Sequence, residues 1–271
     1  TIDDALRVVA ELNAAGAMAT LDVLGESVSE RSKATQAVEE YLRVLDEIAR
    51  RGLDSNVSIK PTMLGLSIDE GFCRDNIARI AEAAKGHGNF VRIDMEDRST
   101  TEATLRIFKE LHGSLGNVGV VLQAYMRRTP KDIAELPEPT PEKNVNIRIC
   151  KGIYVEPRTA AWKGYETIRL AYVNALEKLI ARGIYPAIAT HDEYLVAAAV
   201  GLVHRYQLPR EGYEFQMLLG VDEELRRLLL AEGHRLRVYV PYGKDWHPYS
   251  VRRLRETPEI ARHVLRSMIS R

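Results

Sequence analysis

The chain has 271 residues but little cysteine: Cys73 and Cys150 are its only two, and no C-x-x-C pair occurs. This excludes a disulfide framework and the cysteine spacing of a structural zinc site, and it favours a reducing, cytoplasmic compartment. Lys and Arg equal Asp and Glu at 38 each, so no excess charge favours nucleic acid. The longest apolar stretch, Leu195–Val203, is much shorter than the roughly 18 residues of a membrane span.

A dinucleotide-binding fingerprint is also missing. No G-x-G-x-x-G follows the first predicted strand, and the glycines of Gly113–Gly119 have the wrong spacing and precede a strand. A doubly wound sheet, the alternative α/β architecture, is therefore disfavoured.

Short β-branched segments alternate with amphipathic helical segments along the whole chain. Eight such units in a chain of this length predict an α/β fold of the (β/α)8 TIM-barrel type, as a single catalytic domain over residues 1–271. Several strands are interpreted as lacking strict polar alternation, as expected for strands buried on both faces. The predicted strands are Ala17–Asp22, Val57–Lys60, Phe90–Met95, Val118–Ala124, Val145–Cys150, Tyr185–Thr190, Tyr213–Leu218 and Leu236–Val240.

Helix signals occur between these strands. Ser67–Glu70 and Ser99–Glu102 have the capping-box spacing, and Thr129-Pro130 predicts a Thr cap followed by Pro at the first helical position. Thr1–Ala15 predicts an extra amphipathic helix that either plugs the barrel bottom or docks on its side. The chain begins with Thr rather than Met, so we expect an N-terminal segment to precede it in the full protein.

Polar side chains follow or end most of the predicted strands. In a TIM barrel the carboxyl ends of the strands carry the catalytic groups, and buried charges there need partners or a ligand. We therefore expect these side chains to meet at one rim. They are Lys60, Asp94, Glu96, Gln123, Arg148, Lys151, Thr190, His191, Asp192, Gln216 and Tyr239.

Other interpretations of these residues stay open at this point. Lys60, Asp94 and Arg148 would also suit a structural ion-pair network. His191 with Asp192 would suit a metal, although no H-x-H or H-E-x-x-H accompanies them. Lys60 or Lys151 would suit a Schiff-base lyase, whereas Lys151 before a glycine is also typical of a phosphate-binding turn.

The segment Arg237–Glu256 carries the strongest single signal. An alternating strand runs into a Pro-Tyr-Gly turn, and the adjacent Arg252 and Arg253 follow near the start of a helical stretch. Guanidinium groups bind carboxylates in a bidentate fork, and a helix N-terminus favours anions. The segment therefore predicts a site for a small carboxylate, although a solvated basic helix start or a surface for an acidic protein partner is an alternative.

Taken together, the strings VSIKPT, VRIDMED, LQAY, IRICKGIY, ATHD, YEFQMLLG and RVYVPYG…W.PY..RRLRE resemble the proline dehydrogenase family in order and spacing. The resemblance covers nearly the whole chain. It implies a distorted (β/α)8 barrel that holds FAD non-covalently and oxidises L-proline to Δ1-pyrroline-5-carboxylate by hydride transfer from proline C5 to flavin N5. It also implies a membrane quinone as electron acceptor, with at most peripheral contact to the inner face of a bacterial membrane.

The resemblance also implies roles for single residues. Asp94 and Arg148 match the polar catalytic pair, with Arg148 near the flavin. The substrate-binding positions are Lys60, Leu218, Tyr239, Tyr249, Arg252 and Arg253. The cofactor-binding positions are Met95, Gln123, Arg148, Lys151, Gly152, Ile153, Thr190, His191 and Glu256.

Two departures and one retained residue refine these expectations. Ile153 stands where the family commonly has alanine, which would tighten the space beside the flavin, and His247 replaces a commoner tyrosine. Tyr239 is retained, which favours proline over hydroxyproline. The length leaves no room for an aldehyde dehydrogenase half, so the chain resembles the monofunctional bacterial enzymes.

Overall fold

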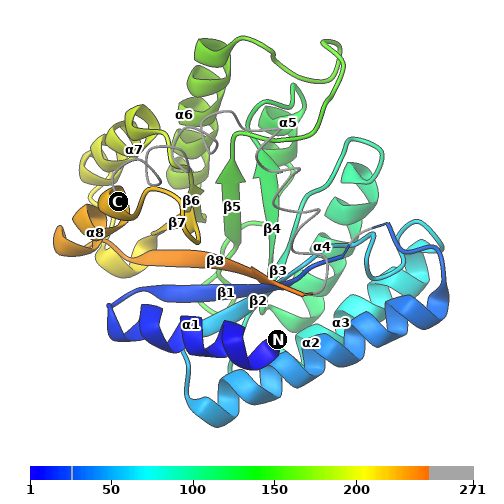
Figure 1. Ribbon diagram of the computed structural model, residues 1–271. Helices are drawn as coiled ribbons and strands as arrows, with labels where there is room; N and C mark the ends of the chain where they lie inside the picture. The colour runs from blue at the N-terminus through cyan, green and yellow to red at the C-terminus, as the bar shows by residue number, and fades with distance from the viewer. Residues whose placement is uncertain (26, 244–271) are drawn as a thin grey trace.

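The computed structural model describes residues 1–25 and 27–243, which form a closed barrel of eight parallel strands inside a layer of helices (Figure 1). Each strand pairs with the next, and β8 closes the barrel against β1. The predicted fold class is confirmed, and each predicted strand agrees with an observed one within three residues at either end. The strands are β1 Met18–Val23, β2 Ser55–Ile59, β3 Val91–Ile93, β4 Val118–Gln123, β5 Asn146–Cys150, β6 Tyr185–Ala189, β7 Glu214–Leu218 and β8 Leu236–Tyr242.

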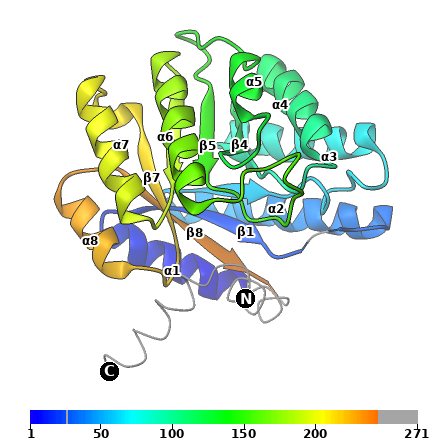
Figure 2. The same cartoon turned by 90° about the horizontal axis from the view of Figure 1, so that it is seen from above.

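The helices lie around the outside of the strands when the barrel is turned (Figure 2). Seven of them follow β1 to β7 in turn. The helical stretch predicted to follow β8, with Arg252 and Arg253, lies outside the described residues. The helices are α1 Ile2–Ala14, α2 Arg31–Arg51, α3 Glu70–Gly86, α4 Thr101–Leu115, α5 Thr129–Ala134, α6 Tyr165–Ala181, α7 Glu193–Arg205 and α8 Glu223–Ala231, with a short 3-10 turn at Arg210–Gly212.

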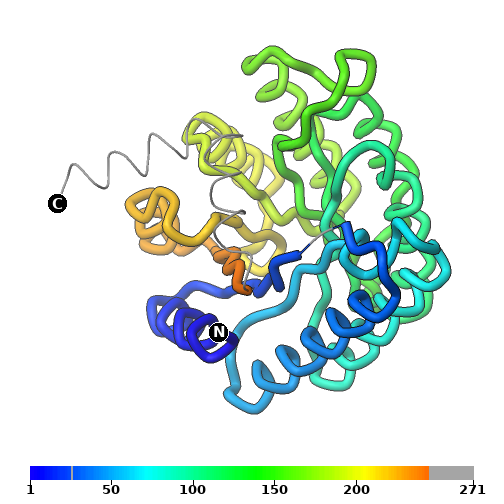
Figure 3. Tube along the Cα trace, turned by 45° about the vertical axis from the view of Figure 1, so that its right-hand side comes forward, coloured from blue at the N-terminus to red at the C-terminus, as the bar shows by residue number. Residues whose placement is uncertain are grey.

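The extra N-terminal helix docks on the side of the barrel. Helix α1 packs against β1 and β8 (Figure 3) and buries Leu6 and Val9 there. Its first turn is closed by a capping box between Thr1 and Asp4. Of the two expected positions for this helix, the structure shows the side and not the bottom.

The predicted helix caps are wrong in detail. Helix α3 is capped by Asp69, whose carboxylate accepts from Phe72 N, and not by Ser67. At α4 the side chain of the cap residue Thr100 makes no capping hydrogen bond. The Asp97 carboxylate accepts from Ser99 instead. Helix α5 already includes Thr129, whose hydroxyl donates to the Gln123 carbonyl. At all three helices the observed acceptor is a nearby carboxylate or carbonyl oxygen and not the hydroxyl of the predicted cap.

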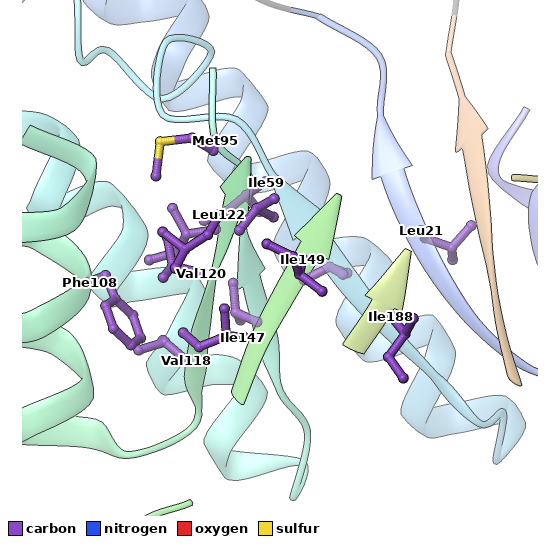
Figure 4. Packing of buried hydrophobic residues seen from close by; sticks show 14 of the residues in the cluster. Leu21, Ile59, Met95, Phe108, Val118, Val120, Leu122, Ile147, Ile149 and Ile188 are labelled. Carbon is purple, nitrogen blue, oxygen red and sulfur yellow. The ribbon is translucent and has the colours of Figure 1, made fainter. Parts of the chain in front are cut away.

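Apolar and polar residues do alternate along the strands, contrary to the interpretation from sequence. Figure 4 shows apolar side chains such as Leu21, Ile59 and Ile149 on the helix-facing side, where Phe108 of α4 lies beside Val118. The residues between them face the barrel interior and are largely polar. The strands are buried on both faces, but only one face is apolar.

The lower interior holds a buried ionic cluster. Arg237 on β8 donates to Glu214 on β7 at 3.0 Å, and both side chains are less than a tenth exposed. Arg92 on β3 is fully buried and donates to the carbonyls of Val120 and Asn146. Burial lowers the pKa of Arg92 to about 9, with Arg148 adding to the shift. The cluster fills the space that apolar layers occupy in most barrels of this type.

We expect Arg237→Met to destabilise the protein by about 3–5 kcal/mol, because it leaves the Glu214 carboxylate buried without its counter-charge. Chemical denaturation measures the change. The matched control is Arg43→Met, which removes an exposed pair with Glu40 and should cost less than about 1 kcal/mol. Equal effects of the two substitutions would contradict a stabilising role for the interior pair.

Candidate functional site

A cavity of about 350 Å³ lies at the carboxyl end of the strands, within the size range of ligand sites. Every sequence-predicted site residue that the structure describes lines it. These are Lys60, Asp94, Met95, Gln123, Arg148, Lys151, Gly152, Ile153, Thr190, His191, Leu218 and Tyr239. Tyr249, Arg252, Arg253 and Glu256 lie outside the described residues.

Asp94 and Arg148 meet at the floor of this cavity. Arg148 Nη1 donates to Asp94 Oδ1 at 2.7 Å, and its Nε donates to Gln216 at 2.5 Å. Asp94 also accepts from Ser58 at 2.6 Å and from the Tyr239 hydroxyl at 3.1 Å. Burial opposes ionisation of Asp94, but the charges of Arg148 and Lys60 outweigh it and lower its pKa. Asp94 is therefore an ionised acceptor with a fixed orientation.

A second carboxylate, Asp22 on β1, lies beneath Lys60. Lys60 Nζ donates to both oxygens of Asp22, at 2.7 and 2.6 Å, and the Asp22 side chain has no exposed surface. Burial raises the pKa of Asp22 more than Lys60 lowers it. Tyr41 of α2 reaches the same place and donates to the Ser58 carbonyl at 2.9 Å. Asp22 was missed as a site residue, although its place at the end of a predicted strand could have indicated it.

Glu96 forms the wall on the β3 side. Its carboxylate accepts from the backbone N–H of Thr62 at 2.9 Å and from the Thr62 hydroxyl at 2.5 Å. Gln123 Nε2 donates to the Glu96 carbonyl at 2.8 Å, so its amide is held across two strand ends. Burial raises the pKa of Glu96, and the Thr62 hydrogen bonds only partly oppose this.

The loop after β5 is supported from below by Tyr125. Gly152 has φ of +109°, and a Cβ added there would lie 2.1 Å from the Tyr125 ring. The Tyr125 hydroxyl donates to the Tyr154 carbonyl, and its backbone N–H donates to the Lys151 carbonyl. Only glycine fits between this ring and the cavity. The backbone of Gly152 therefore forms part of the cavity wall itself.

Lys151 points along this wall and is held by Asp192. Its Nζ donates to Asp192 Oδ2 at 2.8 Å. Tyr165 and Arg169 of α6 bind the same carboxylate. Burial disfavours the charge on Asp192, but the hydrogen bonds of Arg169 and Lys151 outweigh it and lower its pKa well below the usual range. No sequence signal indicated Tyr165 or Arg169, because both lie inside a helix and not at a strand end.

His191 is held by the neighbouring strand. Its Nε2 accepts a hydrogen bond from the backbone N–H of Leu218 at 3.0 Å, which occupies the lone pair that a metal would use. Among residues 1–25 and 27–243, no group of three or more His, Cys, Asp or Glu side chains could hold a metal ion.

The cavity suits a planar, largely apolar group with polar edges. Apolar side chains such as Met95, Ile153 and Leu218 line it together with the cations Lys60, Arg148 and Lys151 and the carboxylates Asp94, Glu96 and Asp192. Arg148 Nη2 is buried and has no hydrogen-bond partner within the described part of the chain. Since a buried donor without a partner is costly, this atom could donate a hydrogen bond to an acceptor bound in the cavity. These features fit the isoalloxazine ring of a flavin.

The comparisons with known proteins agree on one family. The model of the family described as "Proline dehydrogenase" matches residues 5–265. The chain is 36% identical over 271 residues to "Proline dehydrogenase 1" of Bacillus subtilis (strain 168), covering all of this chain and 88% of that protein. It is 35% identical over 274 residues to "Proline dehydrogenase" of Deinococcus radiodurans, covering 99% and 87%.

Among solved structures, the barrel is similar to proline utilization A (PutA) from Bdellovibrio bacteriovorus inactivated by N-propargylglycine. The TM-score is 0.86 at 24% identity, and the match covers 94% of this chain. The chain spans about a third of the length of that solved chain (31%). This likeness supports the fold.

We expect Gly152→Ala to destabilise the protein by more than the roughly 1–2 kcal/mol that a left-handed backbone costs a residue with a Cβ. The added methyl would collide with the Tyr125 ring. Gly183→Ala is the matched control, because Gly183 also has positive φ (+69°) but has no atom within 4 Å of an added Cβ. Thermal and denaturant unfolding of both variants separates the two effects. Equal losses of stability in the two variants would show that the Tyr125 ring moves to accommodate the added methyl group.

Proposed function

We propose, since the chain belongs to the proline dehydrogenase family, that it oxidises L-proline to Δ1-pyrroline-5-carboxylate with FAD bound non-covalently in the barrel mouth. The supporting observation is the convergence of Lys60, Asp94, Arg148 and Tyr239, which lie in or directly after four different strands, on one cavity. When bound, the flavin supplies the acceptor for a hydride from proline C5.

The protein contributes orientation at the substrate end. Lys60 is fixed by the bidentate contact with Asp22, so its ammonium group is aimed before a substrate carboxylate arrives. Tyr239 is fixed by its hydrogen bond to Asp94, which leaves its ring to shape the pocket around the proline carbons, together with Leu218. The undescribed Arg252, Arg253 and Tyr249 are proposed to complete this end.

The charges also act on the protonation state of the substrate. A secondary amine must be neutral to release hydride from the adjacent carbon. The cations Lys60 and Arg148 both line the cavity and disfavour a further positive charge in contact with them, although Asp22 compensates Lys60 from below. Asp94 offsets part of this field, but its carboxylate is already engaged by Arg148, Ser58 and Tyr239.

At the cofactor end, we assign the flavin contacts to the wall formed by β4, β5 and β6. Arg148 and Lys151 supply positive charge to a ring that becomes anionic on reduction, and Gly152 allows close approach of the backbone. Met95, Gln123, Ile153, Thr190 and His191 line the same space, and Glu256 is expected to join them.

The electron acceptor is proposed to be a membrane quinone, reached through peripheral contact of a cytoplasmic protein with the bilayer. In the described part of the chain, no helix combines the length and apolar character needed to cross a membrane.

A Schiff-base lyase is less compatible with the site. Both candidate amines are engaged by carboxylates, Lys60 by Asp22 and Lys151 by Asp192. A Schiff base on either lysine would break an ion pair and leave a buried carboxylate without its counter-charge.

An anaerobic absorbance spectrum before and after addition of L-proline tests the proposal. We expect a flavin spectrum that bleaches with proline. A flavin that stays oxidised would keep the cofactor but remove proline as the substrate. A colourless chain that stays inactive with added FAD would overturn both assignments.

Two lysine substitutions separate the proposed ends of the cavity. We expect Lys60→Met to raise the KM for proline about tenfold or more, the equivalent of a charged hydrogen bond worth roughly 1.4–3 kcal/mol, while the flavin content of the folded protein is unchanged. Lys151→Met should instead weaken FAD binding. Steady-state kinetics and flavin-to-protein ratios measure the two effects. An unchanged KM in the Lys60 variant would remove this residue from the substrate end.

A further inference from the structure

Asp192 is the centre of a compact cluster at the edge of the cavity. Its carboxylate accepts from Lys151 at 2.8 Å, from the Tyr165 hydroxyl at 2.9 Å and from Arg169 at 2.9 and 2.8 Å. Its side chain is 1% exposed. Lys151 lines the cavity, whereas Arg169 lies behind Asp192, between the rings of Tyr165 at 4.2 Å and Tyr194 at 4.8 Å.

The charges of the cluster differ in their exposure to solvent. Lys151 and Arg169 are two cations on one buried carboxylate, Asp192. A second carboxylate, Glu166, contacts Arg169 Nη1 at 3.1 Å, but it is 76% exposed. Water and salt screen an exposed charge strongly. Among the described residues, Asp192 and the two partly exposed cations that bind it, Lys151 (23% exposed) and Arg169 (20% exposed), therefore carry one net positive charge close to the cavity wall.

Arg169 decides how much of the Lys151 charge is compensated. While Arg169 binds both oxygens of Asp192, the carboxylate is shared between two cations. Without Arg169 the same carboxylate would neutralise Lys151 alone. With Arg169 present and Asp192 uncharged, both cations would act on the cavity.

We propose that Arg169 and Asp192 are positioning residues that set the net charge beside the flavin, through Lys151, and thereby tune its reduction potential. This inference rests on the proposed function, because it takes the flavin to bind against Lys151. Hydride transfer adds two electrons and one proton to the neutral oxidised ring, so the reduced ring carries a negative charge. A positive charge nearby stabilises the reduced form and raises the potential.

The experiment compares midpoint potentials of flavin-loaded variants, measured by equilibration with a reference dye and without proline. We expect Arg169→Met to shift the reduction equilibrium about tenfold toward the oxidised flavin, which is about 30 mV lower for a two-electron couple. Asp192→Asn should shift it in the opposite direction, and asparagine can still cap α7. The double variant restores one net positive charge and should return near the parent value.

Two controls isolate charge from structure. Arg169→Lys keeps the charge and should keep the potential. Arg205→Met removes an arginine of α7 that pairs with Glu177 and lies outside the cluster, so it should leave the potential unchanged. Because general damage to the fold would move both single variants in the same direction, opposite shifts identify an electrostatic effect.

Three outcomes would overturn the inference. Equal potentials in all variants would remove the cluster from control of the flavin. Shifts of the same sign in Arg169→Met and Asp192→Asn would indicate only a structural role. A chain that binds no flavin would overturn the cofactor assignment as well, which distinguishes failure of the proposed function from failure of this inference alone.

Discussion

The structure depends on mutual compensation of charges inside the barrel. Asp22, Asp94 and Glu214 share the interior with Lys60, Arg92, Arg148 and Arg237, and each carboxylate is within hydrogen-bond distance of a cation. An isolated ion in such a place would cost several kcal/mol. The polar interior is therefore stable only as a set, and removing one member exposes its partner to the full desolvation penalty.

This constraint explains where the apolar core lies. The interior cannot supply much hydrophobic stabilisation, so the outer faces of the strands must do so. Leu21, Ile59, Ile149 and Ile188 pack toward the surrounding helices (Figure 4). Because the apolar side chains lie on the outer faces of the strands, the centre of the barrel can hold polar side chains. The strand backbones keep these side chains at fixed spacing.

Sequence patterns predicted the strands and the residues at their ends, because both follow from local order and from the geometry of parallel sheets. Polar alternation was misjudged, since charged residues at interior positions such as Arg92 are unusual in this fold class. Asp22 was missed as a site residue, although it ends the first predicted strand. Arg169 could not be found, because its contact with Asp192 joins residues 23 positions apart through the tertiary fold.

Equal numbers of acidic and basic residues in the whole chain do not make the site neutral. Lys60 and Asp22 form a pair with no net charge at one end of the cavity, whereas Lys151 and Arg169 share the single buried carboxylate of Asp192 at the other. Among the described residues, the excess charge thus lies on the side where the backbone of Gly152 forms the cavity wall. Because burial slows the decay of an electrostatic field, Arg169 outside the cavity changes the electrostatic potential inside it.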